Sequence, residues 1–256
     1  MSIFHAAILG IVEGIAEFLP ISSTGHLILA ERILHIDASA FAKSFGIMIQ
    51  LGAIMAVVAL YRKKLADPET AKKVLVAFVP TGIVGLLLYK TVKTYLLGSV
   101  PVVLSALMAG GVMLIVFELL HAESESDAGS IKEISYRQAA MIGLVQSVAI
   151  VPGVSRSAAT IVGGLALGIR RTAIVEFSFL LAAPTMLAAS GLDLVKNYAT
   201  FSAADFWALA VGFAVSFLVA RLSIRFLLAY VKRRTFVPFG IYRIAAACAG
   251  FFFLYR

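Results

Sequence analysis

The sequence predicts an all-α polytopic membrane protein with six transmembrane helices, two re-entrant helical hairpins and an inverted-topology repeat. The 256 residues are 61% hydrophobic and only 14% charged, with a mean hydropathy of +0.98. Six apolar stretches have the length of a membrane span. Two further apolar stretches are broken by Pro-containing turns and resemble each other. We expect one membrane domain over residues 1–256.

The composition excludes an ordinary soluble domain, which carries about 25% charged residues. Lipid must therefore cover much of the surface. The net charge is +8, but Lys and Arg cluster at the ends of apolar segments, which is typical of membrane anchoring and not of nucleic-acid binding. The first residues lack a basic segment and a small-residue cleavage site, so we expect no cleaved signal peptide. The single Cys248 allows no intrachain disulfide.

Six stretches are expected to span the membrane, because each approaches the ~20 helical residues that cross a ~30 Å hydrocarbon core. These are residues 44–61, 74–92, 101–120, 174–195, 205–230 and 237–255.

Residues 6–33 and 139–168 are each expected to form a re-entrant hairpin. Their apolar runs stop at Phe18-Leu19-Pro20 and at Val151-Pro152-Gly153, and each arm is about a dozen residues, too short to span. Irregular backbone at membrane depth is tolerated only inside protein or beside a water-filled cavity.

The two hairpin regions align without gaps, 6–23 on 139–156. Six positions are identical, and Glu13 falls opposite Gln146. We therefore expect repeat one over about 1–121, a cytoplasmic loop over about 122–136 and repeat two over about 137–256. Three spans per repeat invert the second copy, so the broken helices should meet near the midplane and form the binding site there.

The Lys and Arg residues predict the orientation. The richer set lies within residues 62–73, 132–137, 170–171 and 232–234. The poorer set is Arg32, Lys43, Lys90, Lys93, Lys196 and Arg256. The richer side should be cytoplasmic, which leaves the first hairpin and both termini facing outward.

Glu13 and Glu17 lie four residues apart, on one face of the first helical arm. They are either solvated charges at the water interface or a functional pair that holds a divalent cation, acts as acid and base, or does both. Mg²⁺ and Ca²⁺ prefer carboxylate oxygens, and substrate phosphate often completes the coordination of Mg²⁺.

Polar residues follow the first turn, namely Ser22, Ser23, Thr24, Gly25 and His26. Ser and Thr can cap the second arm, but capping explains only one or two hydroxyls. Ser23 and His26 can share a helix face, which permits a hydroxyl nucleophile beside a base. The free N–H groups of a helix N-terminus also suit an anion.

The matching place in the second hairpin holds Ser155, Arg156, Ser157 and Thr160. An Arg inside an apolar hairpin needs an anionic partner. That partner is either Glu13 or Glu17 in an ion pair, or the oxygens of a bound phosphate, and the two arrangements are compatible. Gln50 and Glu176 are expected to support the site. The set predicts a site for a phosphate or pyrophosphate with a lipid tail.

The run from Glu13 to His26, with its Glu-x-x-x-Glu core, and the run Pro152-Gly153-Val154-Ser155-Arg156-Ser157-Ala158-Ala159-Thr160 resemble the two motifs of the undecaprenyl pyrophosphate phosphatase family, the bacitracin-resistance phosphatases of bacteria. Phe45 to Gly52, Glu176 to Leu181 and Phe236 to Arg243 also resemble family segments. Ala158 stands where Gly is expected, and Ala16 where Thr is frequent. Neither change removes a chemical group assigned to the site.

The resemblance implies hydrolysis of undecaprenyl pyrophosphate to the monophosphate and inorganic phosphate. The reaction would recycle the carrier lipid of cell-wall peptidoglycan synthesis and confer bacitracin resistance. The implied location is the bacterial inner membrane, with the active site open to the periplasmic face. A homodimer is compatible with the sequence.

The expected mechanism is phosphoryl transfer. Glu13 and Glu17 bind Mg²⁺ or Ca²⁺, and Glu17 also acts in proton transfer. Arg156 stabilises charge on the transferring group, and Ser23 is the nucleophile with His26 as its base. The expected substrate-binding residues are Ser22, Thr24, Gly25, Gln50, Ser155, Ser157 and Thr160. Two alternatives stay open: an activated water in place of Ser23, and a transporter or flippase of a polyprenyl phosphate that uses the same inverted-repeat site.

Overall fold

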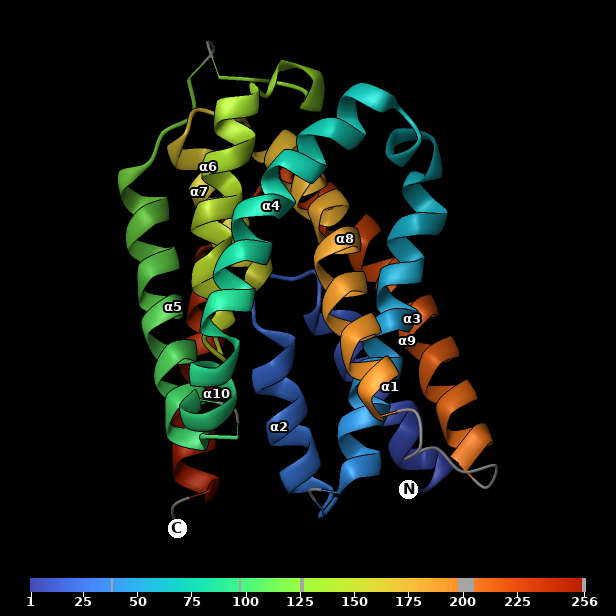
Figure 1. Ribbon diagram of the computed structural model, residues 1–256. Helices are drawn as coiled ribbons and strands as arrows, with labels where there is room; N and C mark the ends of the chain where they lie inside the picture. Colours follow the sequence, from blue (N-terminus) through green and yellow to red (C-terminus); the bar gives the residue numbers. More distant parts are fainter. Residues whose placement is uncertain (38, 97, 125–126, 198–204, 255–256) are drawn as a thin grey trace.

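The computed structural model describes residues 1–37, 39–96, 98–124, 127–197 and 205–254. Arg256 and the side chains of Lys43, Lys93 and Lys196 lie outside this description. The described chain is a bundle of helices without a β-strand (Figure 1). The helices are α1 Ile3–Ala16, α2 Ser23–Ile33, α3 Ala40–Leu65, α4 Pro68–Thr91, α5 Val100–Leu120, α6 Tyr136–Gln146, α7 Arg156–Ala166, α8 Arg171–Asn197, α9 Phe206–Val231 and α10 Val237–Leu254.

Six helices in the described part of the chain are long and apolar enough to cross a membrane, namely α3, α4, α5, α8, α9 and α10. The predicted spans are therefore confirmed in number and place. Helix α4 begins at Pro68, earlier than predicted, because Asp67 caps its first turn. The Asp67 carboxylate accepts hydrogen bonds from the backbone N–H of Thr70 at 3.0 Å and from its hydroxyl at 2.8 Å.

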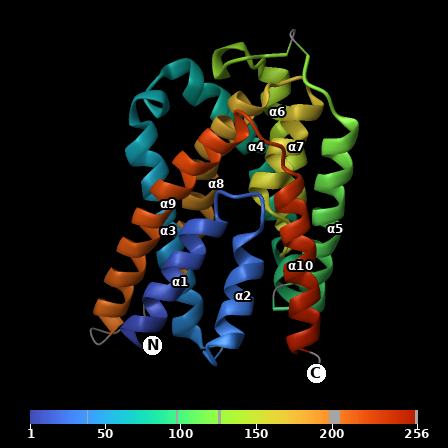
Figure 2. The same cartoon turned by 180° about the vertical axis from the view of Figure 1, so that it is seen from behind.

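The four short helices form two hairpins, α1–α2 and α6–α7. Both open ends of α1–α2 lie at the lower end of the bundle in Figure 1, and both open ends of α6–α7 lie at the upper end. The turn of each hairpin lies near mid-height, as the reverse view in Figure 2 also shows. Helices of 14 and 11 residues are about 17–21 Å long, which is shorter than a ~30 Å hydrocarbon core.

A serine caps the first arm of each hairpin, Ser2 before α1 and Ser135 before α6, but the second arms start differently. Ser135 and Gln138 form a reciprocal capping box that begins α6, and the Ser155 hydroxyl accepts the Ala158 N–H at 3.1 Å to begin α7. Ser22 occupies the corresponding position before α2, but its side chain makes no cap bond. Its φ of 74° is uncommon for a residue with a side chain, and such backbone often occurs at functional sites.

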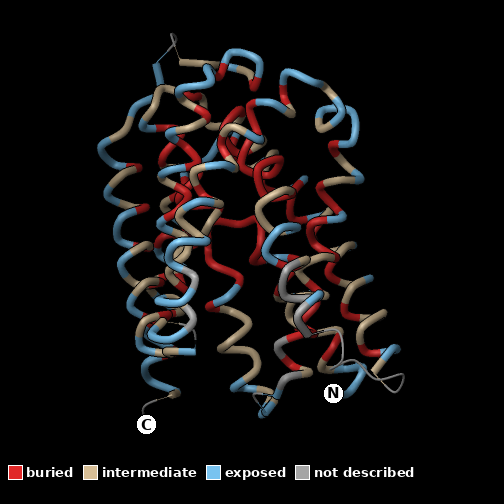
Figure 3. Tube along the Cα trace, in the orientation of Figure 1, coloured by how far each residue is buried: buried red, intermediate tan, exposed pale blue. Residues whose placement is uncertain are grey.

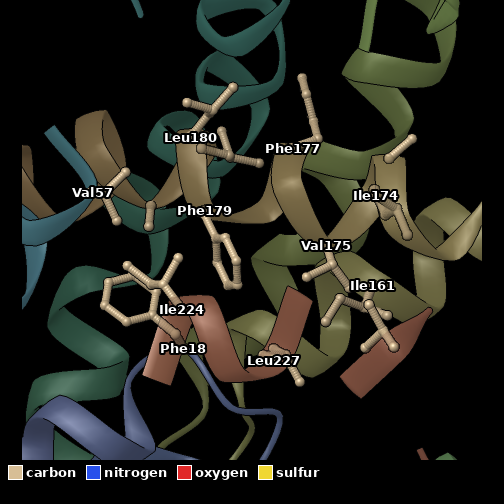
Figure 4. Packing of buried hydrophobic residues seen from close by; sticks show 14 of the residues in the cluster. Phe18, Val57, Ile161, Ile174, Val175, Phe177, Phe179, Leu180, Ile224 and Leu227 are labelled. Atoms are coloured by element: carbon tan, nitrogen blue, oxygen red, sulfur yellow. The ribbon is translucent and has the colours of Figure 1, made fainter. Parts of the chain in front are cut away.

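The core lies around the two turns (Figure 3). Phe18, from the turn of the first hairpin, packs edge-to-face on Phe179 of α8 at 5.5 Å between ring centroids. Figure 4 shows the surrounding cluster, in which Val57, Ile161 and Ile224 come from three other helices. The hairpins themselves lie against long helices, α1 along α9 and α6 along α4. The turns are therefore enclosed by protein.

The Lys- and Arg-rich segments gather at one end of the bundle. Residues 62–73, 132–137, 170–171 and 232–234 all lie near the upper end in Figure 1, where α3, α7 and α9 finish and α4, α8 and α10 start. Arg32 and Lys90 lie toward the opposite end. We call the upper end the basic end.

Candidate active site

The two hairpin turns meet in the middle of the bundle. The Ser157 hydroxyl, in the first turn of α7, donates a 2.8 Å hydrogen bond to the Phe18 carbonyl in the turn after α1. Both residues are buried. A side chain of one hairpin thus satisfies backbone of the other, which irregular backbone in an enclosed position requires.

The central contact of the site joins Arg156 to Glu17. The Arg156 Nη2 lies 2.9 Å from the Glu17 Oε1, and its Nη1 donates to the Ser178 carbonyl at 2.9 Å. The Ser23 hydroxyl donates to the other carboxylate oxygen, Oε2, at 2.7 Å. Glu17 is 6% exposed, so it is a buried carboxylate with a cation on one oxygen and a hydroxyl on the other. The predicted meeting of Glu17 and Arg156 is therefore observed.

These groups line a cavity of about 120 Å³. Its walls are Glu17, Ser22, Ser23, Thr24, Gln50, Ala149, Val154, Ser155, Arg156 and Met186. Seven of the residues proposed from sequence are among them. The wall is built from both hairpins together with α3 and α8, and its side chains include one cation and several hydroxyls that can donate to an anion.

Glu13 lies behind this wall, one helical turn before Glu17. It is fully buried, and neither of its carboxylate oxygens has a hydrogen-bond partner in the described structure. The charges of Glu17 and Arg156 are close enough to act on it. A buried carboxylate without donors is costly, so this position fits a group that a cation completes.

The donor set around these carboxylates suits a hard divalent cation. No group of three or more His, Cys, Asp or Glu residues that could hold a metal occurs in the part of the chain the structure describes. A cation between Glu13 and Glu17 would therefore need water and phosphate oxygens to complete its shell. Mg²⁺ is commonly bound in this way, by one or two carboxylates and substrate phosphate.

His26 points away from Ser23. Its Nδ1 lies 2.8 Å from the Ser22 carbonyl, which can only accept, so Nδ1 carries the proton and donates. Its Nε2 lies 2.9 Å from the Tyr242 hydroxyl, and the two rings are nearly parallel, 9° apart. Ser23 therefore bonds to Glu17 and not to His26. The role of His26 as base stays a prediction, while Glu17 is the basic group in contact with Ser23.

Three predicted binding residues lie outside the cavity wall. Ser157 bridges the hairpins, and Gly25 packs against Leu107 of α5, which a side chain would meet. Thr160 donates either to the Arg156 carbonyl at 2.9 Å or to the Gln146 side chain at 3.2 Å. Their contacts support the wall, and substrate contact by these residues stays a prediction.

Glu176 was wrongly expected near the site. Its carboxylate pairs with Lys64 at 2.6 Å at the basic end, in a separate cavity. Gln50, the other supporting residue expected from sequence, does line the site, and its Oε1 accepts from the Ser190 hydroxyl at 3.0 Å. Sequence reasoning gave no role to Tyr242, which holds His26. The only sequence signal was the position of Tyr242 in an apolar segment that resembles the family.

Comparisons with known proteins show the family to which the chain is similar. The family described as bacitracin resistance protein BacA matches residues 6–249. The chain is 50% identical over 255 residues to the undecaprenyl-diphosphatase of Wolinella succinogenes, covering 99% of each chain. It is 50% identical to that of a Sulfurihydrogenibium species, over 95% of this chain and 96% of the relative. It is 49% identical to that of Aquifex aeolicus, over 95% of each.

Proposed function

The chain belongs to the bacitracin resistance protein BacA family, and on that premise we propose that it is an undecaprenyl-diphosphatase. The reaction is hydrolysis of undecaprenyl pyrophosphate to undecaprenyl phosphate and inorganic phosphate. The observation that carries the proposal is the buried Arg156–Glu17 contact, with Ser23 on the same carboxylate, in the wall of a cavity. A cation, a base and a hydroxyl at one point are the groups that phosphoryl transfer uses.

Arg156 binds the pyrophosphate. Its planar guanidinium matches phosphate oxygens, and its Nε is buried without a partner in the described structure, so one donor is left over. The hydroxyls of Ser22, Thr24 and Ser155 add further donors around the cavity. Charge that develops on the transferring phosphoryl group is stabilised by donors already fixed in place.

Ser23 is the proposed nucleophile. Its Oγ attacks the terminal phosphorus, the bond from that phosphorus to the bridging oxygen breaks, and undecaprenyl phosphate leaves. Glu17 accepts the hydroxyl proton, because it already accepts that hydrogen bond. Water then hydrolyses the phosphoserine and releases inorganic phosphate. In the alternative, Glu17 or His26 activates a water that attacks directly, and Ser23 only binds the phosphate.

Glu13 and Glu17 are proposed to hold Mg²⁺ or Ca²⁺. The unpartnered Glu13 oxygens support this assignment. When bound, the ion neutralises charge on the pyrophosphate oxygens. Glu13 would add negative charge to the binding site of the ion, and Glu17 would supply a second carboxylate to hold it.

The hairpins are proposed to be re-entrant and to belong to two inverted repeats, 1–121 and 137–256, joined by a cytoplasmic loop over 122–136. The packing supports this. Gly10 of α1 lies against the backbone of Gly212 in α9, and the equivalent Gly143 of α6 lies against the backbone of Ala77 in α4. Each first arm therefore crosses the second span of the other repeat, and glycine permits the close approach.

The basic end is proposed to be cytoplasmic and the opposite end periplasmic, by the distribution of Lys and Arg. The open ends of α1–α2 then face the periplasm of a bacterial inner membrane. There the enzyme would recycle the carrier lipid for peptidoglycan synthesis and cell shape. By removing the pyrophosphate form that bacitracin sequesters, it would also confer resistance.

Purified protein in detergent tests the proposal. We expect phosphate release from undecaprenyl pyrophosphate with multiple turnovers. A detergent micelle does not separate two compartments, so a flippase would show no reaction under these conditions. Absence of phosphate release from folded protein supplied with Mg²⁺ or Ca²⁺ would favour the transporter, which the arrangement of two opposed hairpins also allows.

A further inference from the structure

Arg243 on α10 is the largest fully buried side chain outside the site described above, at 1% exposure. Its guanidinium contacts no carboxylate in the described chain. It donates instead to four backbone carbonyls, those of Ala106 and Leu107 on α5, Pro20 and Gly153, at 3.2–3.3 Å. Burying a cation is costly unless hydrogen bonds compensate it. These four hydrogen bonds supply that compensation for Arg243.

Two of these carbonyls come from the turns that carry the reacting groups. Pro20 lies between Glu17 and Ser23 in the first turn, and Gly153 lies three residues before Arg156 in the second. Carbonyls in irregular backbone have no helical partner, so a donor from another element must satisfy them. One guanidinium does this for both turns and ties both to α5.

The second turn is shaped for this contact. Gly153 has a φ of +93°, which L side chains rarely adopt, and a Cβ there would clash with the Val103 carbonyl. The turn therefore lies directly against Val103 and Ala106 of α5. Gly110 of α5 lies directly against the Arg243 guanidinium, where even one methyl group would displace it.

We propose that Arg243 is a positioning residue for phosphoryl transfer, which holds the two hairpin turns at the separation that lets Arg156, Glu17 and Ser23 act together. The inference rests on the proposed function. The other hydrogen bonds between the turns are those of Arg156 with Glu17 and of Ser157 with Phe18, in the described part of the chain. Arg243 links the two turns from a third element, α10, and does not line the cavity.

The test compares two variants with matched controls, by initial rates of phosphate release in detergent per folded molecule. Arg243→Lys keeps the charge but loses the fork that reaches both turns. Gly110→Ala keeps every hydrogen-bonding group and displaces the guanidinium. The controls are Arg225→Lys, an exposed residue on α9, and Gly85→Ala on α4, where a Cβ meets nothing within 4 Å.

We expect kcat to fall about 10²-fold in both variants, the effect of a misplacement near 1 Å. KM should change less than kcat, because the lipid tail contributes binding that does not depend on the turns. The controls should keep wild-type kcat. Wild-type kcat in folded Gly110→Ala, or in folded Arg243→Lys, overturns the inference, since a purely stabilising residue lowers the folded fraction and not the turnover of folded molecules. An inactive wild-type protein would instead refute the proposed function.

Discussion

The two hairpins place different groups at corresponding positions. Glu13 and Gln146 are 133 positions apart and match in the alignment. The Gln146 amide donates to the Thr81 hydroxyl at 2.9 Å, and its oxygen lies 3.2 Å from the Thr160 hydroxyl. Glu13 is equally buried but has no partner in the described structure. The residue at this matching position thus serves packing in the second hairpin, as Gln146. In the first hairpin it is Glu13, which is left available for a ligand.

The same offset pairs Ser23 with Arg156. The first hairpin therefore supplies the hydroxyl and the carboxylates, and the second supplies the cation. Their contact point, the Glu17 carboxylate, depends on both. The comparison teaches that two similar hairpins can contribute different groups to one site when a few matching positions hold different residues.

Removing the contribution of the second hairpin should have the largest effect. Arg156→Ala is expected to lower turnover by about 10³-fold or more, the range for an arginine that stabilises phosphoryl transfer. The variant also leaves the Glu17 carboxylate buried without its cation. Phosphate release measures the loss, and Arg137→Ala, an exposed change on α6, is the matched control. Near-normal rates in membrane-inserted Arg156→Ala protein would contradict the assignment.

The second hairpin has Gln146 where the first has Glu13, so Glu13→Gln makes the first hairpin resemble the second and tests the role of Glu13 in metal binding. EDTA should abolish turnover, and Mg²⁺ or Ca²⁺ should restore it. Glu13→Gln removes one negative charge from the site, so about 10–100-fold more metal should be needed for half-maximal rate. Titration of activity against metal concentration measures this. Full activity in the presence of EDTA would remove the metal role of both carboxylates.

The reverse change, Gln146→Glu, makes the second hairpin resemble the first and should lower the stability of the fold. Gln146→Glu places a carboxylate where the Thr81 and Thr160 hydroxyls now bond to an amide, and it removes the donor that satisfies Thr81. We expect a loss of about 1–3 kcal/mol in the free energy of unfolding, measured by denaturation in detergent. The metal requirement should stay that of the wild type. A changed requirement would show that this position also contacts the ion.

The smallest expected effect concerns the support of the first hairpin by α10. Tyr242→Phe removes the hydroxyl that contacts His26 and keeps the stacked ring. One hydrogen bond contributes about 0.5–1.5 kcal/mol, so turnover should fall about twofold to tenfold if His26 must be oriented. An unchanged rate together with an inactive His26→Ala variant would show that the Ser22 carbonyl alone orients the ring.

The spans and the Glu17–Arg156 contact could be predicted from sequence for a simple reason. Hydropathy over a fixed length predicts a span. An Arg inside an apolar hairpin needs acceptors, and the paired carboxylates of the other hairpin supply them. The hydrogen bond of Ser23 could not be predicted. A spacing of three residues places Ser23 and His26 on one helix face, but the ring turns instead to Tyr242, 216 positions away.

Arg243 and Glu176 show the same limit of sequence reasoning. Both lie in apolar helices, and both could have faced the site or an end of the bundle. Glu176 pairs with Lys64 at the basic end, whereas Arg243 binds carbonyls at the centre. Which of these occurs depends on the rotation of α8 and α10 in the bundle, which is set by packing against other helices and not by the residues beside them.

The separation of Glu17 and Arg156 along the chain, 139 positions, has a consequence for biogenesis. At about 5–20 residues per second, a ribosome needs roughly 7–28 s to add the intervening chain. Throughout that time the nascent first hairpin lacks Arg156, the cation that pairs with Glu17. Its insertion should therefore be completed late, after the second hairpin emerges, and truncated chains that end before residue 156 should remain accessible to protease or to insertion chaperones.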